Sequence, residues 1–246
     1  MLEKKYYKRA LNLAWPAVFE SFFIALAGII DTFMISALGP SAVAAIGLTA
    51  QPKFIALTIF FATCSAVSAL VARRQGEKNR DKANQTLVTA LLLTLIFIVI
   101  TTAMMIYFAD PILKFAGSTE ETHAMAYEYF VIIMAGIGFS AISQVINAAH
   151  RGAGNTQIAF VTNLVSSIVN ISFNYLLIGG RLGFPALGTK GAAIATVLGT
   201  VVSTIMCIIS LTRPRSYLNF KMMRKEKIKI NKTISKEISN LGINIF

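Results

Sequence analysis

The stretch WPAVFESFFIALAGIIDTFMIS, Trp15–Ser36, is long and apolar enough to cross a membrane, yet it contains two acids, Glu20 and Asp31. A hydrocarbon core of about 30 Å is crossed by about 20 helical residues. A carboxylate inside that core costs at least about 2.5 kcal/mol, so it is retained only where it faces other helices or a water-filled cavity. The stretch therefore predicts a transmembrane helix with a candidate functional carboxyl group.

Comparable apolar runs recur along the rest of the chain. The composition is 55% hydrophobic and 14% charged with a mean hydropathy of +0.66, whereas ordinary soluble domains are about 25% charged. Because the runs are unbroken and longer than the alternating strands of a membrane barrel, they predict helices. We expect an all-α, multi-pass protein of the inner (plasma) membrane with six transmembrane helices, within Leu11–Ala37, Ala44–Ala72, Thr86–Phe108, Ala124–Ala149, Ile158–Ile178 and a last run after Lys190 that ends near Leu211.

The distribution of basic residues predicts the orientation. The net charge is +12, and most Lys and Arg lie before the first run, in Arg73–Gln85 and after Thr212. Short loops rich in these residues stay in the cytoplasm, so both termini are expected there. Contact with anionic lipid headgroups accounts for the charge without a nucleic-acid partner. The expected division is a six-helix lobe over 1–211, a basic cytoplasmic linker over 212–236 and the truncated start of a seventh helix over 237–246.

Cysteine and histidine give no sign of a catalytic or metal centre. Cys64 and Cys207 fall inside predicted spans and are read as small apolar residues, and His123 and His150 fall at opposite membrane faces. We therefore expect neither an enzyme nor a cofactor.

Polar residues inside the spans predict a cation site. Asp31 and Asn174 lie about 9 Å from the outer ends of their helices and Thr196 about 12 Å, and Asn170 and Asn174 share one helix face. Oxygen ligands around one negative charge suit a sodium ion or a proton. We predict that Asp31, Asn170, Asn174 and Thr196 bind the cation, with sodium as the tentative metal at Asp31. The alternative is that the polar groups only hold helices together. Glu20, eleven residues before Asp31 on the same face and nearer the cytoplasm, is expected to contact a neighbouring helix or a substrate.

Several segments carry a family resemblance. They are WP at 15–16, GIIDTFMISALGPSAVAAIGL at 28–48, VARRQGEKNRDKA at 71–83, AAHRGAGNTQ at 148–157, NISFNYLLIGG at 170–180 and GFPALGTKGAAIAT at 183–196. In this order and spacing the chain resembles the N-terminal half of the multidrug and toxic compound extrusion (MATE) transporters. The resemblance implies two six-helix lobes around a cavity, and export of organic cations or other amphiphiles in exchange for sodium ions or protons. It implies the same cation residues, although some members carry Asp where this chain has Asn174.

The resemblance leaves alternatives for the function. A transporter of this family needs about twelve helices, so the chain is expected to be a truncated product, a split half or a half that pairs with itself. Its expected partners are a second six-helix lobe, membrane lipids and a small amphiphilic or cationic substrate. An inactive fragment is one alternative. A lipid-linked oligosaccharide flippase of the same superfamily is another, ranked lower because Lys53 is the only base placed within a span.

Overall fold

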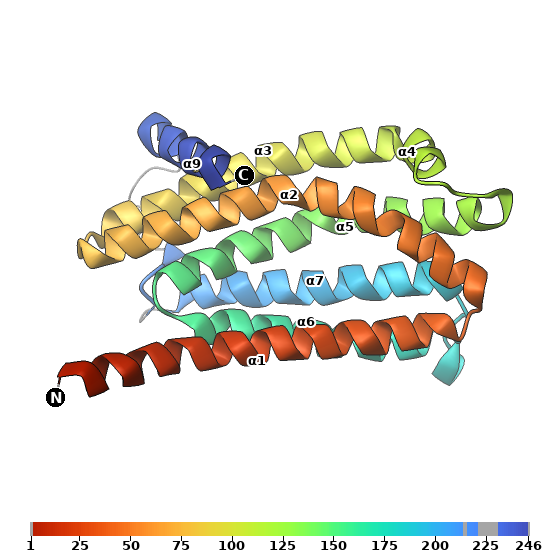
Figure 1. Ribbon diagram of the computed structural model, residues 1–246, viewed down its shortest axis with the longest axis horizontal. Coiled ribbons are helices and arrows are strands. Elements are labelled where there is room, and N and C mark those ends of the chain that lie inside the picture. Colours follow the sequence, from red (N-terminus) through yellow and green to blue (C-terminus); the bar gives the residue numbers. More distant parts are fainter. Residues whose placement is uncertain (1, 214–215, 221–230, 246) are drawn as a thin grey trace.

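The computed structural model describes residues 2–213, 216–220 and 231–245, and shows a bundle of long helices lying side by side (Figure 1). Six helices are long and apolar enough to cross a membrane, which confirms the six predicted spans. The helices are α1 (Leu2–Ser36), α2 (Pro40–Gly76), α3 (Arg80–Tyr107), α4 (Ala109–Phe115), α5 (Glu120–Gly152), α6 (Thr156–Leu177), the 3-10 turn η1 (Arg181–Gly183), α7 (Gly188–Thr212) and α9 (Lys232–Ile245).

Local sequence explains where the helices break. Gly39 adopts a φ of 98°, a conformation that glycine takes without steric cost, and Pro40 follows as the first residue of α2. Pro52 lies inside α2, and Figure 1 shows that this helix bends along its length. The backbone thus turns tightly between α1 and α2, and α2 curves away from α1 afterwards.

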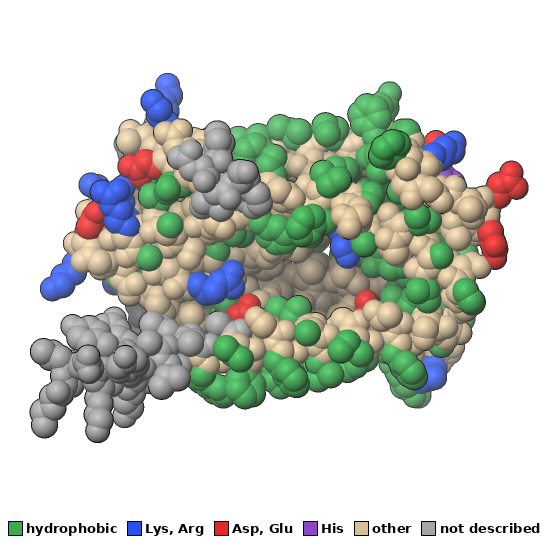
Figure 2. Space-filling model, in the orientation of Figure 1, with side chains coloured by type: hydrophobic (Ala, Val, Ile, Leu, Met, Phe, Trp, Pro, Cys, Tyr) green, Lys and Arg blue, Asp and Glu red, His purple; other side chains and the backbone are tan. Residues whose placement is uncertain are grey.

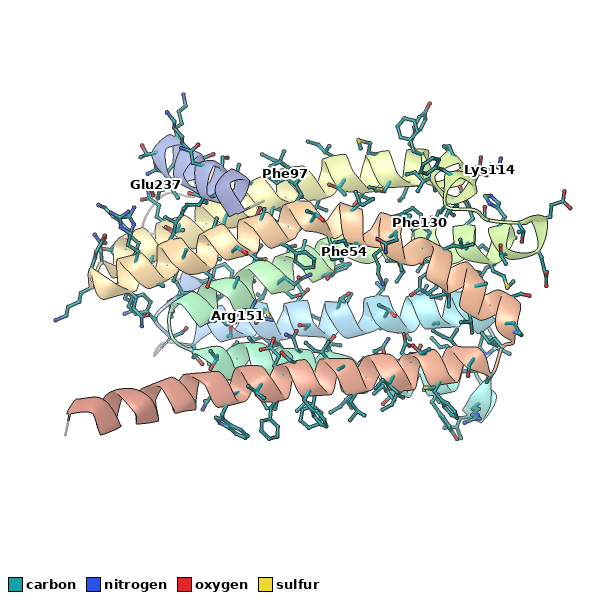
Figure 3. The ribbon with its side chains drawn as sticks, in the orientation of Figure 1. Phe54, Phe97, Lys114, Phe130, Arg151 and Glu237 are labelled. Carbon is teal, nitrogen blue, oxygen red and sulfur yellow. The ribbon has the colours of Figure 1, made fainter. Side chains whose placement is uncertain are left out.

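Helix α5 lies at the centre of the bundle and packs against α2, α3 and α7. Buried side chains form two clusters, one including Leu70, Leu87 and Val145, the other including Phe60, Phe130 and Met134. Helix α1 packs mainly on α6. It leaves many large apolar side chains exposed, as on the lower edge of Figure 3, which is expected where lipid replaces water as the solvent.

The space between α1 and α2 is hollowed. Figure 2 shows this depression in the middle of the face, with α1 forming one wall and α2 lying on the opposite side. The contacts between α1 and α2 are few compared with those between α1 and α6. One face of the lobe therefore presents an open, partly polar surface within the membrane-spanning region.

Three details differ from the sequence predictions. Helix α1 begins at Leu2 rather than Leu11, and the short helix α4 lies in a segment predicted as a loop. Helix α9 begins at Lys232, five residues before the predicted start of a seventh helix, because Ile234 and Ile238 bury their side chains in the cluster around Leu70. Arg74 of α2 also holds Glu237 of α9 at 3.0 Å. Part of the predicted linker, residues 214–215 and 221–230, lies outside the described residues.

The orientation in the membrane remains a prediction, and it can be tested by cysteine labelling. A single cysteine at Thr119, exposed before α5, is expected to react with an impermeant thiol reagent added to intact cells, whereas one at Asn79, before α3, is expected to react only after lysis. The native Cys64 and Cys207 are buried, so the background should be low. Labelling of Asn79→Cys in intact cells would contradict cytoplasmic termini.

Candidate functional site

The predicted cation residues are joined by hydrogen bonds across three helices. Asn174 of α6 donates through its Nδ2 to Oδ1 of Asp31 on α1, and the same nitrogen lies 3.4 Å from Oδ1 of Asn170. Asn170 donates to Oγ1 of Thr196 on α7 at 3.1 Å, and Thr196 donates to the carbonyl of Ala192 at 2.9 Å. The structure therefore brings together Asp31, Asn170, Asn174 and Thr196, while their role in cation binding stays a prediction.

Two oxygens of this cluster have unused acceptor capacity. The side chain of Asn174 is fully buried, and its Oδ1 has no hydrogen-bond partner. A buried amide oxygen without a partner costs about 1–3 kcal/mol, so such atoms usually mark a site for something else. Asp31 is half-buried, and its Oδ2 accepts no hydrogen bond from the described residues. Within those residues no group of three His, Cys, Asp or Glu side chains could hold a metal ion, so the cluster suits a monovalent cation better than a transition metal.

Glu20 has partners that sequence reasoning missed. Asn163 of α6 donates to its Oε1 at 2.6 Å, and Nη1 of Arg151, at the end of α5, lies 3.4 Å from the same oxygen. Arg151 lies 131 residues further along the chain, so its ion pair with Glu20 could not be inferred from the residues around Glu20. Glu20 makes the predicted helix contact. It fastens the N-terminal half of α1 to α5 and α6, and the ion pair is largely shielded on the Glu20 side.

A cavity of about 740 Å³ lies beside the C-terminal ends of α1 and α6, and Asn174 forms part of its lining. Phe33 and Leu38 line it from the α1 side, and Tyr175 from the α6 side. The guanidinium of Arg181 lies 4.1 Å from the centre of the Tyr175 ring, a cation–π arrangement that fixes the arginine at this opening. The cavity therefore lies against the buried Asn174, at the end of the lobe where α1 and α6 end.

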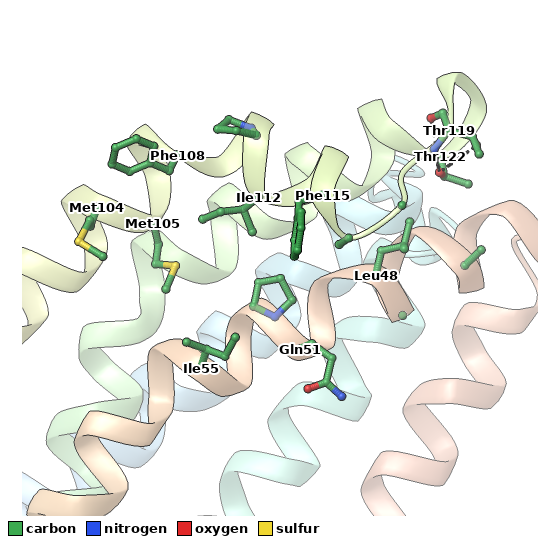
Figure 4. Close-up of a pocket in the computed structure, with 16 residues that line it drawn as sticks. Leu48, Gln51, Ile55, Met104, Met105, Phe108, Ile112, Phe115, Thr119 and Thr122 are labelled. Carbon is green, nitrogen blue, oxygen red and sulfur yellow. Dashed lines mark hydrogen bonds between the residues drawn. The ribbon is translucent and has the colours of Figure 1, made fainter.

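A larger cavity, of about 1050 Å³, lies elsewhere, between the N-terminal part of α2 and the segment from the end of α3 through α4 (Figure 4). Its lining is mainly apolar, including Ile55, Met104, Met105 and Phe115, with Gln51 among the few polar groups. None of the predicted site residues lines it. Its chemistry suits hydrocarbon and offers little to a small ion.

A second polar cluster lies on the loop between α4 and α5. Ser118 Oγ lies 2.7 Å from Nδ1 of His123, and Nε2 of the same ring lies 3.0 Å from Oδ1 of Asp110. Lys114 lies 2.9 Å from Oδ2 of Asp110, and Lys114 together with His123 holds the pKa of that exposed carboxyl below its usual range. Because Asp110 on α4 is shared between Lys114 and His123 on α5, we interpret this cluster as a clasp between α4 and α5.

The six spans around a polar cluster in the membrane define a multi-pass protein of the inner membrane, built as a transporter lobe. The family model described as MatE matches residues 16–176. The chain therefore belongs to the MatE family. This is a family of transporters rather than of enzymes, and its members include multidrug efflux transporters.

Relatives agree with this assignment. The chain is 30% identical over 197 residues to the probable multidrug resistance protein NorM of Thermotoga maritima, covering 79% of this chain and 42% of that protein. It is 31% identical over 193 residues to an FAD transporter of Shewanella oneidensis, covering 78% of this chain and 43% of that protein. The chain thus spans about half the length of the curated relatives it matches.

Solved structures show the same lobe. A MOP superfamily transporter from Pyrococcus furiosus, described as having a binding pocket of reverse polarity, aligns with a TM-score of 0.86 at 27% identity, over 96% of this chain and 51% of that one. An outward-facing MATE family multidrug transporter aligns equally well, with a TM-score of 0.86 at 27% identity over the same shares. The predicted fold, one six-helix lobe of a MATE transporter, is confirmed.

Proposed function

We propose that the chain forms one lobe of an antiporter that exports organic cations and drugs in exchange for sodium ions or protons. The observation that carries this proposal is the hydrogen-bonded cluster from Asp31 to Thr196, in which the buried Oδ1 of Asn174 has no partner. A cation bound beside Asp31 would use that oxygen and the free Oδ2 of the carboxylate. Its charge would also offset the cost of holding a carboxylate in the membrane.

The weak packing of α1 suggests how cation binding changes the lobe. Helix α1 contacts α6 far more than any other element. Its polar links to the bundle include Asp31 with Asn174 in the outer half and Glu20 with Asn163 in the inner half. When a cation neutralises Asp31, the charge-assisted hydrogen bond from Asn174 weakens. The outer half of α1 can then move while Glu20 still holds the inner half, and a shift of that kind would close or open the hollow beside it.

The hollow between α1 and α2 is the surface that we assign to the partner lobe. It contains charged side chains within the span region (Figure 2), and such groups are retained where they face a cavity or another protein surface. The partner would be a second six-helix lobe or a second copy of this chain, related by an axis normal to the membrane. In this arrangement residues 1–211 form the lobe, and the segment from 212 onward leads to α9 on the outside of α2 and α3.

Transport driven by an imposed gradient tests the proposal. The chain is reconstituted in vesicles in two preparations, one with the chain alone and one with the part of the Thermotoga maritima relative that this chain does not match. Efflux of ethidium is followed by fluorescence. We expect an inward sodium or proton gradient to accelerate efflux severalfold in at least one of the two preparations, and a matching ionophore to remove that acceleration. Equal efflux with and without both gradients in both preparations would contradict a cation-coupled antiporter.

A further inference from the structure

The cavity of about 740 Å³ at the C-terminal ends of α1 and α6 combines an apolar wall with one base. Phe33 and Met34 on α1 and Ile171 on α6 form part of the apolar wall. The base is Arg181, in the turn η1 that follows α6. The cavity therefore runs from the membrane-spanning part of both helices to the loop beyond them.

Arg181 has no acidic partner in the part of the chain that the structure describes. Its side chain makes no ion pair or hydrogen bond there, and its guanidinium lies over the ring of Tyr175, 4.1 Å from the ring centre. Because Tyr175 belongs to α6, this stacking holds the positive charge at the mouth of the cavity. A guanidinium stacked by its face keeps the N–H groups at its edge available, and their fork matches two oxygens of a phosphate.

The loop around Arg181 has the composition of a segment at the membrane surface. Leu182 and Phe184 are exposed next to the arginine, and Tyr175 is half-exposed. Figure 1 shows this loop at the end of the bundle, beside the end of α1. Aromatic side chains and arginine are typical of the boundary between hydrocarbon and headgroups. The mouth of the cavity thus lies at the depth of lipid phosphates, and its apolar wall at the depth of acyl chains.

We propose that this cavity binds one anionic phospholipid, with the phosphate on Arg181 and an acyl chain along the apolar wall. The unpaired positive charge and the apolar lining together match the two parts of such a lipid. Helix α2 borders the hollow that we assign to the partner lobe, and it contributes no residue to this lining, so the two surfaces are separate. The inference uses the membrane-spanning fold and does not depend on cation coupling.

The position of the cavity gives the lipid a structural role. Asn174 lines the cavity and donates its hydrogen bond to Asp31 of α1. A lipid in the cavity contacts both α1 and α6, next to the polar cluster that joins them. It therefore braces the C-terminal end of α1 against α6, where α1 has few contacts with the other helices.

Quenching of a reporter tryptophan by brominated phospholipids measures lipid binding at this one place. The reporter is Phe33→Trp, at an exposed position of the cavity wall, in a chain whose only tryptophan is removed by Trp15→Phe. The protein is reconstituted in mixtures of phosphatidylglycerol and phosphatidylcholine with equal chains, of which one lipid is brominated. One base beside an anionic headgroup favours the anionic lipid by about fivefold, so we expect phosphatidylglycerol to be preferred at the reporter by about that factor.

Matched variants assign the preference to Arg181. Arg181→Gln is expected to abolish it, and Arg181→Lys, which keeps the charge, is expected to retain most of it. Lys190→Gln removes another base, one that pairs with Glu128 at 2.8 Å on α5, and should leave the preference unchanged. A second reporter, Val99→Trp at an exposed position of α3, should show no preference in any variant.

Several results would overturn the lipid site. Arg181 is exposed, so its replacement should not affect folding, and an unchanged preference in Arg181→Gln would exclude its role. Absence of a preference in the parent chain, or an equal preference at the Val99→Trp reporter, would exclude a specific site without any variant. Absence of quenching by both lipids would show that protein, such as a second copy, covers the surface. Loss of the preference on adding inorganic phosphate at constant ionic strength would show a site for free anions instead.

Discussion

Replacing Asp31 by asparagine is expected to abolish gradient-driven efflux while the protein stays in the membrane at its normal abundance. The amide has the size of the carboxyl group and can still accept a hydrogen bond from Asn174, so the helices should keep their positions. It has no negative charge to attract sodium and no site that takes up a proton near neutral pH. The other groups of the cluster, Asn170, Asn174 and Thr196, are neutral.

The expected size of the effect follows from the lost charge. Contact between a unit charge and a cation in a partly polar site contributes several kcal/mol, so coupled efflux should fall by at least about 100-fold. The measurement is the initial rate of ethidium efflux under an imposed gradient, divided by the amount of protein in the membrane on an immunoblot. Thr196→Val, which removes one neutral oxygen from the cluster, is the matched variant and should reduce efflux much less.

Full efflux by Asp31→Asn would support the alternative in which the polar groups only hold α1 against α6 and α7. In that case the unpartnered Oδ1 of Asn174 would be a packing defect of the lobe, and the cation would have to bind elsewhere. Loss of the protein from the membrane, with efflux per molecule unchanged, would lead to the same interpretation.

The spans and the polar cluster could be predicted from sequence because both depend on helix geometry. A rise of about 1.5 Å and a rotation of about 100° per residue fix the depth and direction of a side chain once a span is located. For that reason the sequence alone predicts that Asp31 and Asn174 lie at a common depth, although they are 143 residues apart, and the structure joins them by a hydrogen bond.

The contacts that were missed depend on loops and on helix neighbours rather than on periodicity. Arg151 lies beyond the predicted span Ala124–Ala149, although it is the last residue but one of α5 and lies at the depth of Glu20. Helix α4 follows α3 after Phe108 and spans only seven residues, which is too short for an apolar period to identify it.

Replacing Gly152 by alanine is expected to destabilise the lobe, because this glycine allows α5 to meet α2 at close range. A Cβ atom at position 152 would lie 2.4 Å from the carbonyl oxygen of Ser68. The obstructing atom belongs to the backbone of α2, so no side-chain rotation relieves the clash and the two helices must separate. Close approach at small residues is a principal source of helix association in membranes. A Cβ atom added at Gly191 or Gly199 would likewise lie 2.7 Å from a backbone carbonyl oxygen, that of Leu177 or Ser166 respectively.

Overpacking of this kind costs about 1–3 kcal/mol, so the midpoint of thermal unfolding, measured on the purified protein in detergent, should fall by several degrees. The matched control is Gly47→Ala in α2, where an added Cβ has no atom within 4 Å. Alanine has a higher helix propensity than glycine, so the Gly47→Ala control should be neutral or slightly stabilising. The same gain in helix propensity offsets part of the cost of the clash in Gly152→Ala. A Gly152→Ala protein as stable as its parent would show that α2 and α5 can separate without loss, and that the close packing of the central helix does not hold the lobe together.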